Sequence, residues 1–216
     1  PNLYDFVFTL ISKKNNKTLD RVKSYGGMRS IEVKKNKVYL NNKPLYQRLV
    51  LDQGFYPDGI WTAPTDKALK NDIILSMKAG FNGARLHEKV FEDRFHYWAD
   101  KLGYITWAEW GNWGANENAK GTETAFMHEW PKIVEHLKNH PSIITWTPFN
   151  ETNTLECNSQ HKKLMRLAYD ITKKIDPTRP VNETSGYQHQ KTDIWTVHHY
   201  EPNPDKLMKA LNPKKG

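Results

Sequence analysis

Hydrophobic and polar residues alternate with two different periods along this chain. Before about residue 44, apolar side chains recur at every second position, which predicts strands over 4–10, 30–33 and 37–40, with turns at 15–16 and 41–44. After residue 44, short apolar runs alternate with segments of helical period. We expect strands over 45–51, 83–87, 104–109, 143–151, 180–183 and 194–198, and helices over 66–79, 93–102, 123–138 and 159–175.

Strands that alternate with helices of this length predict βαβ units and a parallel sheet. We therefore expect an α/β protein with a (β/α)8 TIM barrel that is truncated after about six strands, because 216 residues fall short of the roughly 250 that a complete barrel uses. The first strands look like the end of a β-sandwich. The predicted domains are 1–28, the end of the sandwich, and 29–216, the incomplete barrel.

Composition and charge narrow the classes of partner. Hydrophobic residues at 38% and aromatic residues at 12% indicate an ordered globular protein. The net charge of +8 lies entirely in residues 1–48, where 11 Lys and Arg face 3 Asp and Glu, and residues 49–216 hold 21 of each. Lysines on exposed hairpins explain this excess, and no basic helix or nucleic-acid motif accompanies it. We expect no nucleic-acid partner.

Cysteine content and hydropathy exclude two further classes of structure. The single Cys157 forms no internal disulfide framework and provides no zinc cluster. No apolar stretch approaches the roughly 18 residues of a membrane span, so we expect no membrane partner. The compartment and the oligomeric state stay open.

Polar residues gather at the C-terminal tips of the predicted barrel strands. Such tips form the active-site face of a barrel, so these residues predict a polar pocket. They are Asp52, Arg85, His87, Glu109, Asn150, Glu151, Glu183, His198, His199 and Tyr200, and we expect a ring of tryptophans around them, Trp107, Trp110, Trp113, Trp146 and Trp195. Carboxylates with aromatic rings suit a carbohydrate, because sugars offer hydroxyl groups and C–H faces.

These residues also fit other interpretations. Taken alone, the pair Asn150-Glu151 is more often a loop start or a helix cap than a catalytic group. His87, Glu109 and His199 could assemble a metal site from three strands, but nothing local resembles a metal signature, so we expect no metal and no cofactor. Adjacent strand residues point to opposite faces, so only one of His198 and His199 is expected in the pocket.

Several ordered motifs resemble glycoside hydrolase family 2, the group of β-galactosidases, β-glucuronidases and β-mannosidases. They are Asn36 to Leu45, Thr65-Asp66 with Asn71-Asp72-Ile73, Gly80 to His87, and the block from Asn139 to Glu151. The segment Leu51 to Gly59 is similar to a bacterial, β-galactosidase-like branch. The resemblance covers residues 24–203 and implies an immunoglobulin-like sandwich that ends near residue 28, before a catalytic barrel.

The resemblance also implies roles for single residues in a retaining β-glycosidase. Glu151 matches the general acid/base, Asn150 contacts the sugar 2-hydroxyl, and Arg85 and His87 match pocket residues near the nucleophile. Tyr200 matches an active-site aromatic, and Glu109, His199 and Trp107 complete the expected substrate-binding set. For its role, Glu151 is expected to have a pKa raised to roughly 6 to 7 by burial and a partner carboxylate.

One departure from the family pattern limits this expectation. The family's nucleophilic glutamate ends the seventh strand before a glycine-rich turn, and no such segment occurs here. We expect the fragment alone to be inactive, with Glu183 or Glu109 as the substitute nucleophile if it is not. A carbohydrate-binding or inactive barrel, and a barrel enzyme with some other polar substrate, are the alternatives. The sugar and its linkage stay open.

Overall fold

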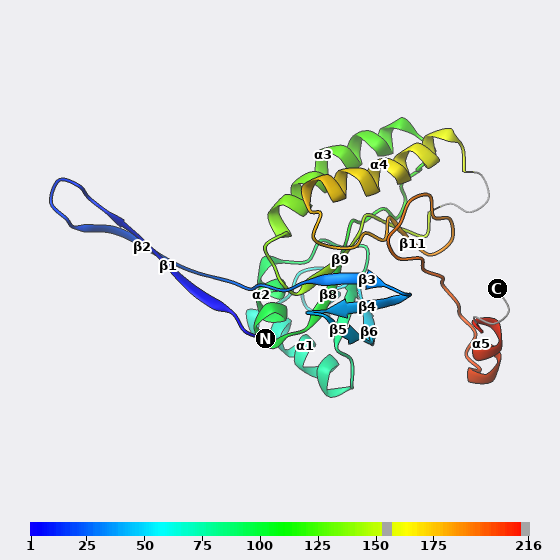
Figure 1. Cartoon of the computed structure of the whole chain (residues 1–216), viewed down its shortest axis with the longest axis horizontal. Coiled ribbons are helices and arrows are strands. Elements are labelled where there is room, and N and C mark those ends of the chain that lie inside the picture. The colour runs from blue at the N-terminus through cyan, green and yellow to red at the C-terminus, as the bar shows by residue number, and fades with distance from the viewer. Residues whose placement is uncertain (153–156, 213–216) are drawn as a thin grey trace.

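A four-stranded parallel sheet forms the centre of the fold. The computed structural model describes residues 1–152 and 157–212. The sheet order follows the chain, β6 (Leu49–Asp52), β7 (Gly83–Leu86), β8 (Ile105–Glu109) and β9 (Ile143–Thr147) (Figure 1). Every pair is parallel, with Leu49 beside Gly83 and Gly83 beside Ile105. All four strands therefore end at one edge, as the sequence predicted.

Helices connect these strands and cover the sheet. They are α1 (Asp66–Lys78), α2 (Asp93–Leu102), α3 (Lys120–Leu137) and α4 (Ser159–Ile175), and α3 and α4 lie side by side (Figure 1). Thr65 caps α1 through the Ala68 N–H at 3.1 Å, and Gly103 ends α2 with φ 72°, a left-handed value that suits glycine. The predicted helices 93–102 and 159–175 are confirmed at both ends, and the other two within three residues.

Beyond β9 the strand ladder is shorter than predicted. Strand β10 (Phe149–Asn150) pairs in parallel with β11 (Thr184–Ser185), and an isolated bridge joins Trp146 to Val181. The predicted strand 180–183 is therefore wrong in its bounds, and the predicted strand 194–198 is absent. Between these two segments, hydrogen bonds from or to side chains take the place of a backbone ladder. Asn182 Nδ2 donates to the Ile194 carbonyl at 2.8 Å, and the Gly186 N–H donates to Thr196 Oγ1 at 2.9 Å.

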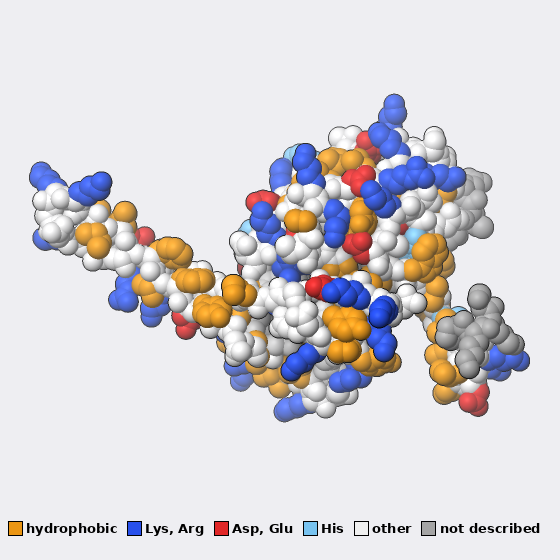
Figure 2. Space-filling model, viewed as in Figure 1, with side chains coloured by type: hydrophobic (Ala, Val, Ile, Leu, Met, Phe, Trp, Pro, Cys, Tyr) orange, Lys and Arg blue, Asp and Glu red, His pale blue; other side chains and the backbone are white. Residues whose placement is uncertain are grey.

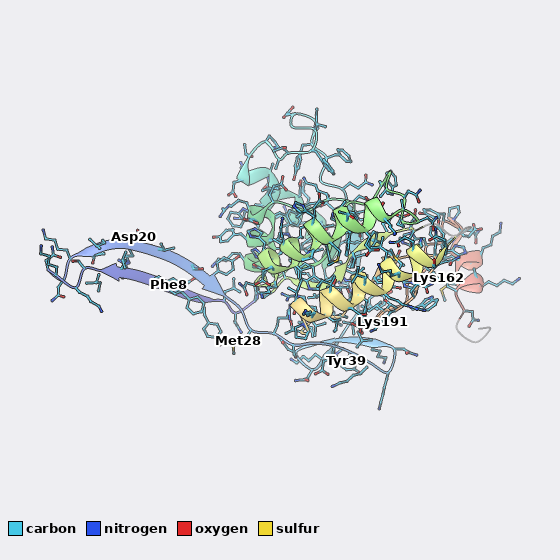
Figure 3. All side chains as sticks on the ribbon, turned by 90° about the horizontal axis from the view of Figure 1, so that it is seen from above. Phe8, Asp20, Met28, Tyr39, Lys162 and Lys191 are labelled. Atoms are coloured by element: carbon cyan, nitrogen blue, oxygen red, sulfur yellow. The ribbon has the colours of Figure 1, made fainter. Side chains whose placement is uncertain are left out.

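The N-terminal region forms an arm and a small sheet. The arm is the hairpin of β1 (Tyr4–Ile11) and β2 (Thr18–Gly26), which projects away from the barrel in both views (Figures 1 and 3). The antiparallel sheet β3 (Ile31–Lys34), β4 (Lys37–Leu40) and β5 (Lys43–Leu45) follows it. The predicted strand 45–51 is wrong, because β5 ends at Leu45 in this sheet and β6 starts at Leu49 in the barrel.

One face of the arm is more apolar than the other. Tyr4, Phe6 and Phe8 lie on one face of β1, the other face carries Asp5, Val7 and Thr9, and Phe8 is 62% exposed. Hydrophobic side chains run along the arm and basic ones cluster at its tip (Figure 2). Because a strand with one apolar face normally packs on a second sheet, we propose that residues 1–28 belong to a β-sandwich.

The core lies between the sheet and its helices, in three clusters. The largest joins β8 and β9 to α3 and α4 through Trp130, Trp146 and Phe126. A second packs α1 and α2 on β7, and a third packs Ile31 of β3 against Ile105, Trp107 and Ile144 of β8 and β9. Gly83 permits this packing, because a Cβ there would lie 2.1 Å from the Ile105 carbonyl oxygen. Among the described helices, which end with the short α5 (Pro204–Ala210), none is long and apolar enough to cross a membrane.

A buried histidine in this core predicts an acid-sensitive fold. His96 is fully buried on α2, where burial and the neighbouring His140 lower its pKa to about 3, although Asp100 acts in the opposite direction. Below the ordinary pKa of about 6.5 the unfolded chain binds a proton that the folded chain refuses, so stability falls as pH falls. Between pH 6.5 and 5, the free energy of unfolding of the His96→Phe variant should fall by about 2 kcal/mol less than that of the unmodified protein. Urea unfolding at both pH values measures this, and parallel losses would contradict it.

Candidate active site

The C-terminal edge of the sheet borders a cavity of about 420 Å³, which we call the strand-tip cavity. It is lined by Leu51, Gln53, Arg85, His87, Trp113, Asn150, Glu151, His198, His199 and Tyr200. The residues come from the ends of β6, β7 and β10, from the loop after β8, and from the segment after β11. Most of the predicted site residues therefore meet in one cavity although they lie on different elements.

Glu151 lies directly after β10 with an unusual backbone. Its φ is 42°, a left-handed value that is uncommon outside glycine, and its N–H donates to the Ser185 carbonyl at 2.9 Å. Its side chain is 25% exposed. In the described part of the chain, the hydrogen bonds to its carboxylate come from His198 Nδ1 and from the Tyr200 hydroxyl at 2.9 Å, and both reach Oε1. None of the described residues donates a hydrogen bond to Oε2.

The electrostatics of Glu151 differ from the expectation. Burial raises the pKa of its carboxyl group, but the hydrogen bonds from His198 and Tyr200 and the charges of His198 and Arg85 outweigh burial, so the pKa lies below its ordinary value. The predicted increase to roughly 6 to 7 is wrong for the unliganded site, because its neighbours are hydrogen-bond donors rather than a partner carboxylate.

Asn150 is held firmly and keeps one donor unused. Its Oδ1 accepts from Arg85 Nη2 at 2.6 Å, and its backbone N–H donates to Asn112 Oδ1 at 2.7 Å. Its Nδ2 is buried and has no hydrogen-bond partner among residues 1–152 and 157–212, and the residue is 1% exposed. A buried orphan donor costs about 1–3 kcal/mol, which a hydroxyl group in the cavity would recover.

Arg85 and Glu109 form the buried floor of the site. Arg85 Nε lies 2.7 Å from Glu109 Oε2, and its Nη2 lies 3.0 Å from Oε1. Glu109 also bonds His87 Nδ1 at 2.8 Å, and its side chain is fully buried. Glu109 thus orients Arg85 and His87 from below and does not line the cavity, which corrects its predicted place in direct contact with substrate.

A metal site at this floor fits poorly. Among the described residues, the ligand atoms of His87, Glu88 and Glu109 lie within 4.8 Å of one another, which would suit a cation. However, Glu109 Oε1 already accepts bonds from Arg85, His87 and the Glu88 N–H. The Arg85 guanidinium would also repel a positive ion at this distance. The group is better explained as an ion pair that positions Arg85.

The expected tryptophan ring does not form. Trp113, which is 71% exposed, does line the cavity. Trp107 is 8% exposed in the barrel interior and donates to Gln47 Oε1 at 2.7 Å. Trp110 and Trp146 pack in the core behind the sheet. The exposed Trp195 ring lies tilted beside His189, with the two ring centroids 4.6 Å apart. The prediction was wrong because strand alternation turns Trp107 and Trp146 away from the cavity, and Trp110 and Trp195 lie on segments outside the strands.

The structure differs from the sequence-based expectation at the two adjacent histidines after β11 and at one asparagine. His198 contacts Glu151, and His199 lines the same cavity, so both histidines enter it. The expectation of only one failed because this segment forms no strand and need not alternate. Asn112 was also missed, although three asparagines within 112–118 marked that loop as unusual.

Both glutamates that the sequence suggests as substitute nucleophiles, Glu183 and Glu109, have buried side chains. Glu183 is fully buried, and its carboxylate accepts from His189 Nδ1 at 3.0 Å and from the Gln190 N–H at 2.5 Å. Glu109 is committed to Arg85 and His87. Neither lines the strand-tip cavity, so each is better explained as a residue that shapes the site.

Several curated β-galactosidases are similar to this chain in sequence. β-Galactosidase of Photobacterium profundum is 30% identical over 207 residues, which are 90% of this chain and 19% of that protein. β-Galactosidase of Kluyveromyces lactis is 24% identical over 91% of this chain and 21% of its own length. The chain therefore spans about a fifth of the length of these relatives.

Solved structures give the same result for the fold. A β-glucuronidase from Parabacteroides merdae superposes with a TM-score of 0.72 at 21% identity, covering 84% of this chain and 23% of that one. A β-glucuronidase from Bacteroides uniformis gives a TM-score of 0.70 at 25% identity, covering 83% and 23%. The family model described as "Glycosyl hydrolases family 2, TIM barrel domain" matches residues 31–214. The chain belongs to glycosyl hydrolase family 2, with residues 31–214 as its TIM barrel domain.

Proposed function

We propose that this chain carries the acid/base half of a retaining β-glycosidase, with Glu151 as the general acid/base. The observation that carries the proposal is the pair at the end of β10, a carboxylate on the cavity wall next to a buried asparagine with an unused donor. Family membership supports the reaction class, and relatives named β-galactosidase support a β-galactoside as substrate.

In this proposal each residue has one task. Glu151 protonates the leaving oxygen in the first step and deprotonates water in the second. Asn150 Nδ2 donates to a sugar hydroxyl, and Arg85 holds Asn150 through its 2.6 Å bond. His198 and Tyr200 fix the carboxylate through Oε1. A bound sugar would exclude water from Glu151, which raises the pKa of the carboxyl group toward that of a proton donor.

The 216 residues alone are proposed to bind sugar without cleaving it. Within the described ranges, Glu151 is the one carboxylate among the residues that line the strand-tip cavity. A double displacement needs a second carboxylate on the opposite side of the sugar. We therefore expect turnover from the full-length protein and binding alone from residues 1–216.

The stereochemistry of the product tests the retaining mechanism. Proton NMR of the full-length protein acting on an aryl β-glycoside should show the β-anomer of the free sugar first, with the α-anomer appearing later by mutarotation. An α-anomer formed first would contradict the proposal, because it would indicate a single displacement by water.

A further inference from the structure

One irregular segment supplies three of the residues that line the strand-tip cavity. Residues 198–200 lie on the cavity wall, yet residues 195–200 belong to no helix or strand. His198 and Tyr200 are also the hydrogen-bond partners of Glu151 Oε1. Because no backbone ladder holds this segment beside Glu151, its position depends on other contacts.

Thr196 is the residue through which the segment is attached. Its N–H donates to His189 Nε2 at 3.1 Å, and its Oγ1 accepts the Gly186 N–H at 2.9 Å. The backbone and the side chain of Thr196 are therefore both bonded to the turn that follows β11. His198 comes two residues later, so the position of Thr196 decides whether the imidazole of His198 reaches Glu151.

A buried histidine–carboxylate pair lies behind Thr196. The side chain of His189 is 1% exposed and that of Glu183 is fully buried, with His189 Nδ1 3.0 Å from Glu183 Oε2. Glu183 Oε1 also accepts the N–H groups of Gln190 and Lys191, at 2.5 and 3.2 Å. Three donors around one carboxylate compensate the cost of burying its charge, and they fold the turn that carries His189.

The contacts of His189 assign the state of its ring. A backbone N–H can only donate, so Nε2 accepts from Thr196 and the ring proton lies on Nδ1, where it is donated to Glu183. Nε2 also lies 3.2 Å from the Thr196 carbonyl oxygen, but a proton on Nε2 would leave the Thr196 N–H without an acceptor among the described residues. A carboxylate that fixes the tautomer of a histidine makes its other nitrogen available for one defined bond.

We infer that Glu183 and His189 are positioning residues for the acid/base group: they hold Thr196, and through it they keep His198 against Glu151. The inference rests on the proposed function of Glu151. It assigns a task to two residues that do not line the strand-tip cavity.

Glu183→Gln in the full-length protein tests the carboxylate. Glutamine keeps an acceptor for the turn but offers an amide donor to His189 Nδ1, so the ring proton moves to Nε2 and meets the Thr196 N–H. We expect kcat for a β-linked disaccharide to fall about tenfold, while KM changes less than about twofold. A defect in substrate binding would raise KM instead.

The pH profile is a readout that a loss of stability alone would not change. Burial raises the pKa of Glu151, whereas His198, Tyr200 and Arg85 lower that pKa below its ordinary value. When His198 moves away, the pKa rises, so the general acid stays protonated to higher pH. The alkaline decline of kcat/KM should therefore begin at a higher pH in Glu183→Gln than in the unmodified protein.

Two substitutions of His189 separate its acceptor from its bulk. His189→Gln can place a carboxamide oxygen near the position of Nε2 and accept the Thr196 N–H, so kcat should stay within about threefold of the unmodified value. His189→Leu fills the space without an acceptor and should show the same kcat and pH profile as Glu183→Gln. If Glu183→Gln does not fold, the difference between the two His189 variants decides the result, and equal losses in both would overturn the inference.

Asp176→Asn is the control for lost stability alone. It weakens a buried ion pair with Arg179, which lies at the opposite end of the barrel strands, before β9. We expect a lower Tm and an unchanged pH profile. If Glu183→Gln and His189→Leu behave like this control, the inference is wrong, although Glu151-dependent hydrolysis still supports the proposed function. If the full-length protein shows no Glu151-dependent hydrolysis, the proposed function fails, and the inference fails with it.

Discussion

Replacing Glu151 by glutamine in the full-length protein is expected to slow hydrolysis of β-linked disaccharides by about 10²- to 10⁴-fold, the usual contribution of a positioned general acid. A glutamine keeps the shape of the side chain and its contacts with His198 and Tyr200 but cannot transfer the proton. Activated aryl glycosides should lose much less in kcat/KM, because their leaving groups depart without protonation.

The comparison of leaving groups makes this result specific. Hydrolysis of a series of aryl glycosides with leaving groups of rising pKa should show a steeper dependence in Glu151→Gln than in the unmodified protein. Tyr200→Phe, which removes one hydrogen bond to Oε1 while leaving the carboxyl group, is the matched control. Equal losses on poor and good leaving groups would show that Glu151 does not act as an acid.

Arg85→Met is expected to destabilise the fold by about 3–5 kcal/mol, the range for breaking a buried ion pair from one side. The change leaves the Glu109 carboxylate fully buried beside His87, and it removes the 2.6 Å bond that holds Asn150. Adding Glu109→Gln should recover at least about 1 kcal/mol, because the double variant no longer buries an unpaired charge. Urea unfolding of the two single variants and the double variant measures this coupling.

An exposed pair provides the comparison. Arg94 and Asp66 lie 2.7 Å apart, but their side chains are 53% and 47% exposed. Arg94→Met should therefore cost less than about 1 kcal/mol. A similar cost at Arg85 and Arg94, or no recovery in the double variant, would contradict the role of Glu109 as the buried partner of Arg85.

Periodicity predicted the parts of the fold that local sequence determines. The helices 93–102 and 159–175 have strong amphipathic patterns, and their bounds were predicted well. Strand β2 and helix α5 were not predicted, and neither contains a buried side chain that would mark its period. The strand predicted over 45–51 crosses two sheets, and a pattern of apolar residues alone cannot show that division.

The sequence predicted that the candidate site lies at the strand tips. It did not predict which tip residues line the cavity and which lie buried beneath it. Arg85, His87, Asn150 and Glu151 line the strand-tip cavity as expected. Glu109 ends its strand like the others, yet the Arg85 guanidinium lies between it and the cavity, which only the packing reveals. The expectation that only one of His198 and His199 enters the cavity failed, because the segment 194–198 lacks the ladder that would enforce alternation. In both cases, hydrogen bonds between side chains that are distant in sequence determine where the residue lies, Arg85 with Glu109 and His198 with Glu151.

Chemical rescue of Glu151→Ala tests the central proposal most directly. With the acid/base carboxylate removed from the full-length protein, an activated aryl β-glycoside should still form the covalent intermediate, and its hydrolysis should then be slow. Added sodium azide needs no general base, so it should restore turnover and give the β-glycosyl azide. Formation of the α-glycosyl azide would identify Glu151 as the nucleophile instead, and no effect of azide would contradict its acid/base role.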